Sequence, residues 1–216
     1  DPAEIMLLAV SKTIPAAVVR EAVVFGQYAF GESYVQEAQR KREELTKLLS
    51  QSGVQGVGRI RFDLIGALQR NKVKHAVGLF DVIQSVDRRE LAAEISSVAV
   101  KRGVEQKVLM QINISREASK SGVLPEHARE LAEDILRLPN IVLMGLMSIG
   151  SFLPENEPEA VRRREFCELA RLQCVLAEQT GSAMPELSMG MSSDFELAIA
   201  EGATIVRVGT ALFGER

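Results

Sequence analysis

The sequence contains very few of the side chains that form disulfides and metal sites. Its 216 residues include two cysteines and two histidines. Cys167 and Cys174 lie seven residues apart in a helical pattern, and two turns of helix separate them by about 10 Å, too far for a disulfide. His75 and His127 are isolated from other ligand-type residues. We therefore expect no disulfide, no metal site and a reducing compartment.

The sequence also has no long apolar run and no large excess of charge of one sign. No run is long enough to span a bilayer, and nothing resembles a signal peptide. The net charge of -3 provides no basic field that would attract nucleic acid or an anionic membrane. Three consecutive arginines at 162–164 lie among glutamates, which is typical of a solvated helix face. We expect a cytoplasmic monomer with no nucleic-acid or membrane partner.

Short β-type runs alternate with longer helical patterns along the whole chain. The β-type runs are 5–10, 28–33, 61–66, 80–86, 107–113, 141–147, 186–190 and 204–209. The helical candidates are 16–25, 36–49, 88–102, 126–138, 159–179 and 194–201, and the glycine-rich segment 51–58 is expected to be a loop. This alternation is typical of βα units with a parallel sheet. Seven or eight such units favour one closed (β/α)8 TIM-type barrel domain over residues 1–216, rather than an open doubly wound sheet.

In such a barrel the active site lies where the strands end and the following loops begin. Small and polar residues gather at these ends. They are Lys12, Glu32, Ser33, Gly66, Ser85, Asn113, Met147, Ser148, 188–192 and 207–210. This concentration predicts a site for a small ligand, although part of it arises because every strand must give way to a polar loop.

The first strand ends in a lysine, in "LLAVSKT". A lysine at a strand end can extend its ammonium group to solvent. Alternatively, Lys12 is a reactive amine, because a desolvated lysine loses its proton readily and can then form a Schiff base with an aldehyde.

The last two units have features of a phosphate site. In "LSMGMSSDFELAIAEG", Ser192 and Ser193 stand at the start of a helix, with Ser193 and Glu196 at the spacing of a capping box. Free N–H groups at a helix start attract phosphate. In "VRVGTALFG", Gly209 permits close backbone approach and Thr210 adds a hydroxyl. An ordinary cap and tight turn is the alternative, but together with Lys12 these groups predict a ligand with both a phosphate and an aldehyde, as in pyridoxal phosphate (PLP).

Arg207 stands in an otherwise apolar strand, two residues before Gly209. An unpaired buried guanidinium is costly, so we expect Arg207 to point into the barrel and to have a partner. That partner is either a carboxylate in a structural salt bridge or the ring nitrogen of PLP. In the second case the ring nitrogen stays unprotonated, because a guanidinium gives up no proton, and PLP is a weaker electron sink.

Seven segments in order resemble the motifs of the pyridoxal phosphate homeostasis proteins, relatives of the alanine racemase N-terminal barrel. They are "LLAVSKT", "FGESYVQEAQRK", "FDLIGALQRNKVK", "QINISREASKSGV", "LMGLMSIG", "LSMGMSSDFELAIAEG" and "VRVGTALFGER", and they cover nearly the whole chain. The resemblance implies that Lys12 forms the Schiff base with PLP. It also implies that Ser192, Gly209 and Thr210 hold the phosphate, that Arg207 faces the pyridine nitrogen, and that Asn113 and Met147 line the ring pocket.

The sequence departs from the family pattern at several points. Ser33 stands where asparagine is usual, Gly150 replaces a proline, and Ala67 and Arg70 occupy positions that vary. The family also has a helix before the first strand, whereas only four residues precede it here. Either that helix lies outside this sequence or one side of the barrel is less well covered.

The resemblance leaves open whether the protein is an enzyme. Racemization of an amino acid needs a second base opposite Lys12, which related racemases supply as a tyrosine from a further C-terminal domain. The tyrosines here, Tyr28 and Tyr34, lie in or near the second unit. We therefore predict a PLP homeostasis protein that holds PLP as a reversible Schiff base and releases it to PLP-dependent apoenzymes. Lys120 is either an aid to this transfer or a surface lysine.

Two alternatives remain. The first is a weak PLP-dependent amino-acid racemase of the same fold. The second is a Schiff-base aldolase acting on a sugar phosphate, with Glu32 as the nearest candidate acid or base.

Overall fold

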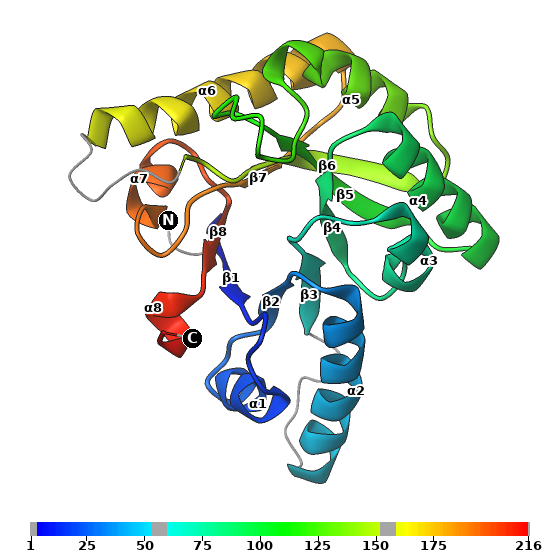
Figure 1. Cartoon of the computed structure of the whole chain (residues 1–216), viewed down its shortest axis with the longest axis vertical. Helices are drawn as coiled ribbons and strands as arrows, with labels where there is room; N and C mark the ends of the chain where they lie inside the picture. Colours follow the sequence, from blue (N-terminus) through cyan, green and yellow to red (C-terminus); the bar gives the residue numbers. More distant parts are fainter. Residues whose placement is uncertain (1–3, 53–59, 152–158, 216) are drawn as a thin grey trace.

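The computed structural model describes residues 4–52, 60–151 and 159–215. Within these residues, eight parallel strands form a closed barrel in which each strand pairs with the next in sequence (Figure 1). The strands are β1 (Met6–Val10), β2 (Ala29–Glu32), β3 (Arg61–Leu64), β4 (Val82–Val86), β5 (Gln106–Ile112), β6 (Ile141–Ser148), β7 (Glu186–Ser188) and β8 (Ile205–Val208). The predicted (β/α)8 fold is confirmed.

Strand β8 closes the barrel on β1, so the first and the eighth strand lie side by side in the sheet. Leu8 pairs with Arg207, and Ala9 with Val208. This register places the end of β1, followed by Lys12, beside the strand that contains Arg207.

The helices lie outside the barrel, as Figure 1 shows. They are α1 (Ala16–Val24), α2 (Val35–Ser52), α3 (Val73–Ala76), α4 (Arg89–Arg102), α5 (Ala128–Leu136), α6 (Glu159–Thr180), α7 (Phe195–Ala200) and α8 (Thr210–Phe213), with the 3-10 turns η3 (Arg70–Lys72) and η4 (Pro125–His127). One large apolar cluster fills the layer between the helices and the strands. The barrel interior contains the buried polar residues Asp63, Gln84 and Ser188 and a second, small apolar cluster, which consists of Leu8, Val82, Leu109, Met147 and Ile205. The interior is therefore a packed core that forms a floor beneath the strand ends.

The observed elements differ from the sequence predictions in several places, and most strand and helix boundaries shift by one or two residues. Helix α2 continues to Ser52, so the loop predicted for 51–58 is wrong at its first two residues, and 53–58 lie outside the described residues. The short helices α3 and α8 were not predicted, because four residues complete barely one turn and give no periodic pattern. The predicted helix 126–138 begins instead with the turn η4.

Several surface predictions can be compared with the structure. Cys167 and Cys174 are exposed and free. Arg163 is an exposed side chain on α6 that pairs with Glu159 and Glu201. No helix in the described parts of the chain is long and apolar enough to cross a membrane. The same residues contain no group of three or more His, Cys, Asp or Glu side chains arranged to hold a metal ion.

Candidate functional site

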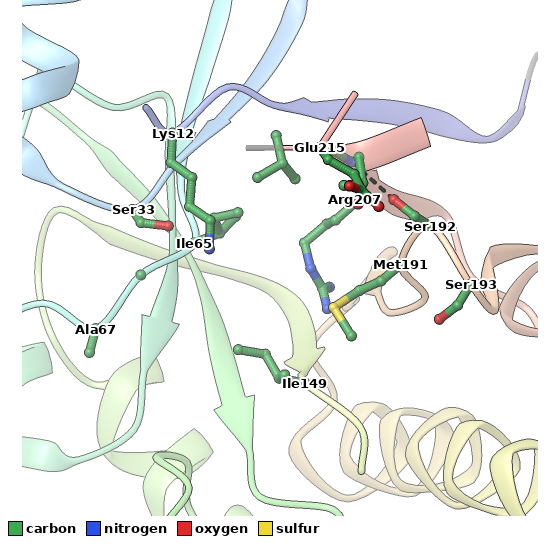
Figure 2. Close-up of a pocket in the computed structure, with 14 residues that line it drawn as sticks. Lys12, Ser33, Ile65, Ala67, Ile149, Met191, Ser192, Ser193, Arg207 and Glu215 are labelled. Atoms are coloured by element: carbon green, nitrogen blue, oxygen red, sulfur yellow. Dashed lines mark hydrogen bonds between the residues drawn. The ribbon is translucent and has the colours of Figure 1, made fainter. Parts of the chain in front are cut away.

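A cavity of about 810 Å³ opens at the carboxyl ends of the strands (Figure 2). Its walls come from the ends of β1, β2, β3, β6, β7 and β8. The lining residues are Val10, Lys12, Ser33, Ile65, Gly66, Ala67, Ile149, Met191, Ser192, Ser193, Arg207, Gly209, Thr210 and Glu215. The size and the mixture of apolar walls with a few polar groups are typical of a small-molecule site.

Lys12 follows β1 and extends into the cavity, where Figure 2 shows it beside Ser33 and Ile65. The backbone on both sides of it is bonded to α2. Glu37 Oε1 accepts a hydrogen bond of 2.5 Å from the N–H of Thr13, which has a positive φ of 65°. Lys41 Nζ donates to the carbonyl oxygen of Ser11. Helix α2 therefore holds the turn from which Lys12 extends.

A buried ion pair lies behind this turn. Lys41 on α2 is 5% exposed and Glu32 at the end of β2 is fully buried, and Lys41 Nζ donates to Glu32 Oε1 at 2.6 Å. The hydroxyl of Ser11 donates to the same oxygen at 2.6 Å. Burial raises the pKa of Glu32, and the hydrogen bonds from Lys41 and Ser11 oppose that rise. Since Glu32 does not line the cavity, the structure does not support the role that the aldolase alternative requires of it.

The loops after β7 and β8 meet at the cavity wall. Ser192 Oγ accepts a hydrogen bond of 3.2 Å from the N–H of Gly209, and Gly190 O accepts one of 3.0 Å from the N–H of Arg207. Gly190 has a φ of +86°, and a Cβ there would lie 2.5 Å from that of Ala198 on α7. Only glycine fits this tight turn, which brings Ser192 against Gly209.

The predicted capping box at Ser193 and Glu196 is wrong. Helix α7 begins at Phe195 with Asp194 as its N-cap residue, and no side chain caps it. Asp194 Oδ1 instead accepts a hydrogen bond of 2.7 Å from the N–H of Met191. The carboxylate of Asp194 thus folds the loop back on itself, which leaves the side chains of Ser193 and Glu196 exposed.

Arg207 points into the barrel, as expected, and its side chain reaches the cavity (Figure 2). It is 4% exposed. One terminal nitrogen donates to Ser188 Oγ at 2.8 Å and the other to the carbonyl oxygen of Ser148 at 2.7 Å. Burial lowers its pKa to about 10, and the charge of Asp194 opposes this. None of the described carboxylates forms an ion pair with Arg207, so a structural salt bridge does not explain its position.

The model for the alanine racemase N-terminal domain matches residues 4–216. The pyridoxal phosphate homeostasis protein of Aquifex aeolicus is 46% identical over 210 residues, which cover 97% of this chain and 86% of that protein. The protein of the same name from Pseudomonas aeruginosa is 44% identical over 216 residues, which cover 100% of this chain and 86% of that protein. The chain belongs to the pyridoxal phosphate homeostasis protein family.

Solved structures agree with this assignment to the homeostasis protein family. PipY of Synechococcus elongatus, solved with PLP bound, superposes with a TM-score of 0.86 at 38% identity, covering 98% of this chain and 93% of PipY. Alanine racemase of Clostridium difficile has a TM-score of 0.76 at 15% identity, and the match covers 99% of this chain and 53% of the racemase. The likeness to the racemase is one of fold alone.

The structure brings together five of the seven residues that the homeostasis family resemblance assigned to the site. Lys12, Ser192, Arg207, Gly209 and Thr210 all line the cavity. Their contacts with a ligand stay predictions.

The other two residues lie outside the cavity lining. Asn113 donates from Nδ2 to the carbonyl oxygens of Glu117 at 2.9 Å and Lys120 at 3.3 Å, so it organises the loop after β5. In that loop Lys120 Nζ donates to Gly150 O at 3.0 Å. Met147 is fully buried in the small apolar cluster of the barrel interior. A ring-binding role for Asn113 and Met147 stays a prediction, as does a transfer role for Lys120.

Sequence reasoning missed the apolar walls of the cavity, Ile65 and Ile149. Each follows the last residue of its strand directly. A search for polar residues at the strand ends overlooks such apolar side chains. Ser33, one of the departures from the homeostasis family pattern, lines the cavity. A Cβ on Gly66 would lie 2.3 Å from Ser33 O, so the loops after β2 and β3 pack against each other at this point.

Proposed function

We propose that this chain binds PLP reversibly in the described cavity, with Lys12 bonded to the PLP aldehyde as a Schiff base, and releases PLP to PLP-dependent apoenzymes in the cytoplasm. The relatives named for PLP homeostasis and the PLP-bound PipY structure support the ligand. One observation supports this proposal most directly. The amine of Lys12, the guanidinium of Arg207 and the turn formed by Ser192 and Gly209 all line the same cavity.

The residues present fit the groups of PLP. When bound, PLP supplies an aldehyde and an electron-withdrawing pyridine ring. Ile65, Ile149 and Met191 offer apolar surface for a flat ring. At one end Lys12 provides the amine, and at the other the hydroxyls of Ser192 and Thr210 are hydrogen-bond donors for a phosphate.

Three groups of this chain have separate tasks in the proposal. Lys12 Nζ would hold PLP by supplying the amine that bonds to its aldehyde carbon, with water as the other product. The hydroxyl of Ser192 already accepts from Gly209 N–H, so its own hydrogen is free to point to an anion. Arg207 can only donate hydrogen bonds, which suits an unprotonated ring nitrogen. Arg207 therefore orients the ring without giving it a proton.

Titration of the purified protein with PLP tests the proposal. We expect a saturable visible absorption band that borohydride removes, because reduction of a Schiff base fixes PLP on the amine. Peptide mass spectrometry should then locate the adduct on Lys12. Absence of the band at saturating PLP would contradict the assignment, and an adduct spread over many exposed lysines would show random modification instead.

Ser192→Ala tests the phosphate end of the cavity. Loss of one hydrogen bond to a charged group costs about 1.5–3 kcal/mol, so the affinity for PLP should fall roughly tenfold or more. Pyridoxal, which has no phosphate, is the matched control ligand, and its affinity should stay within about twofold. Equal losses for PLP and pyridoxal would place the phosphate elsewhere.

A further inference from the structure

A chain of buried hydrogen bonds runs from Arg207 across the barrel to β3. Arg207 donates to Ser188 Oγ at 2.8 Å, and the Ser188 hydroxyl donates to Gln84 Oε1 at 2.7 Å. Gln84 Nε2 donates to Asp63 Oδ2 at 2.6 Å. Ser188, Gln84 and Asp63 are fully buried. These residues come from β8, β7, β4 and β3, so the chain links strands that are not neighbours in the sheet.

The far end of the chain is anchored by Arg61. Its Nε and one terminal nitrogen donate to the two carboxylate oxygens of Asp63 at 2.8 and 2.9 Å. Burial raises the pKa of Asp63, and the donors on Arg61 and Gln84 oppose that rise. In this two-bond geometry both oxygens of Asp63 act as acceptors. Arg61 also approaches Glu186, with one N–O distance of 3.5 Å, but Glu186 takes no part in the path to Arg207.

Arg207 and Asp63, at the two ends of this hydrogen-bond chain, allow only one orientation of Ser188 and Gln84 between them. Arg207 can only donate, so Ser188 must accept from it and give its own hydrogen onward. Carboxylate oxygens can only accept, so the amide of Gln84 must turn its NH₂ toward Asp63 and its oxygen toward Ser188. Asp63 thus determines the orientation of the Gln84 amide and the Ser188 hydroxyl, and through them the acceptor offered to Arg207.

This arrangement matters for Arg207 because the guanidinium is planar and has five N–H donors in a fixed geometry. Bonds to Ser188 Oγ and Ser148 O fix one edge of that plane, each through a different terminal nitrogen. The remaining N–H groups are then held in a defined direction at the cavity wall, and a shift of the fixed edge would redirect them.

We propose that Gln84, Ser188 and Asp63 are positioning residues for Arg207, which hold its guanidinium in the orientation that donates to the ring nitrogen of the bound ligand. This inference rests on the proposed PLP function. Without these hydrogen bonds, Arg207 still carries its charge, but its guanidinium can rotate away from the ring. The selectivity for a ring with an acceptor nitrogen then falls, while binding of the phosphate and the aldehyde continues.

Gln84→Met tests this directly, because methionine keeps the approximate volume and removes both hydrogen bonds. The probes are PLP and a deaza analogue of PLP with C–H in place of the ring nitrogen. Equilibrium titrations should show that the wild type prefers PLP over the analogue about tenfold, as expected for a charge-assisted hydrogen bond. In Gln84→Met the affinity for PLP should fall about fivefold to tenfold, and that for the analogue should stay within about twofold.

Two further variants make the result decisive. Glu186→Gln is the matched control, since it changes the other carboxylate beside Arg61 and should leave both affinities unchanged. Ser188→Ala breaks the same path one bond closer to Arg207 and should repeat the loss of selectivity, which keeps the test valid if Gln84→Met does not fold.

The outcomes separate this inference from the proposed function. If the wild type binds PLP and the analogue equally, or if Gln84→Met and Ser188→Ala leave the preference intact or weaken both ligands alike, the positioning role is wrong. If the wild type binds neither ligand, the proposed function itself is wrong.

Discussion

Lys12→Ala is expected to abolish the visible absorption band of the PLP Schiff base and the adduct that borohydride fixes. The methyl group of alanine cannot form a covalent bond to the aldehyde. The proposed phosphate site at Ser192 and Gly209 and the guanidinium of Arg207 remain, so PLP should still bind, but only through noncovalent contacts and more than about tenfold more weakly. Absorption spectra before and after borohydride, with equilibrium dialysis for the noncovalent binding, measure both effects.

Lys107→Ala is the control for this variant. Lys107 is exposed near the start of β5, at the end of the barrel opposite the cavity, and its loss should leave band and affinity unchanged. An unaltered band in Lys12→Ala would contradict the assignment. In that case Lys120, which is only 14% exposed and bonded to Gly150 O, becomes the next amine to replace.

Lys41→Met is expected to cause the largest loss of stability. The substitution leaves the carboxylate of Glu32 fully buried without its cation, and it also removes the donor to Ser11 O. Breaking a buried pair in this way costs about 3–5 kcal/mol, because a charge is left without compensation. For a chain of this length the midpoint of thermal unfolding should fall by roughly 6–20 °C. Calorimetry or circular dichroism on heating measures the shift.

Two variants distinguish the buried charge from a general effect on α2. Lys47→Met changes an exposed lysine of the same helix and should alter the free energy of unfolding by less than about 0.5 kcal/mol. The double variant Glu32→Gln with Lys41→Met removes both charges and should recover a large part of the loss. If Lys41→Met is as stable as Lys47→Met, the pair contributes nothing.

The fold and part of the site were predictable from the sequence because their signals are local. Alternating apolar runs and helical patterns indicate a barrel without knowledge of any long-range contact. The end of each strand is visible in the sequence, so the positions of Lys12 and Arg207 at the carboxyl ends followed from the fold.

The interactions that stabilise the site were not predictable in this way. Gln84 and Ser188 look like ordinary polar residues, and only closure of the barrel brings them within 2.7 Å. The sequence does not show which of several cations will meet Glu32. The N-cap of α7 was assigned one residue too early because Ser193 fits the capping pattern, while a backbone bond to Asp194 decided the turn.

The pairing of β8 with β1 also affects the order in which the protein can acquire its ligand. Lys12 leaves the ribosome long before Arg207, Gly209 and Thr210, which follow it by almost 200 residues. Leu8 and Arg207 become neighbours only when the last strand docks on the first. A nascent or truncated chain therefore exposes a lysine without an assembled pocket, and a ligand that bridges the seam stabilises only the finished barrel.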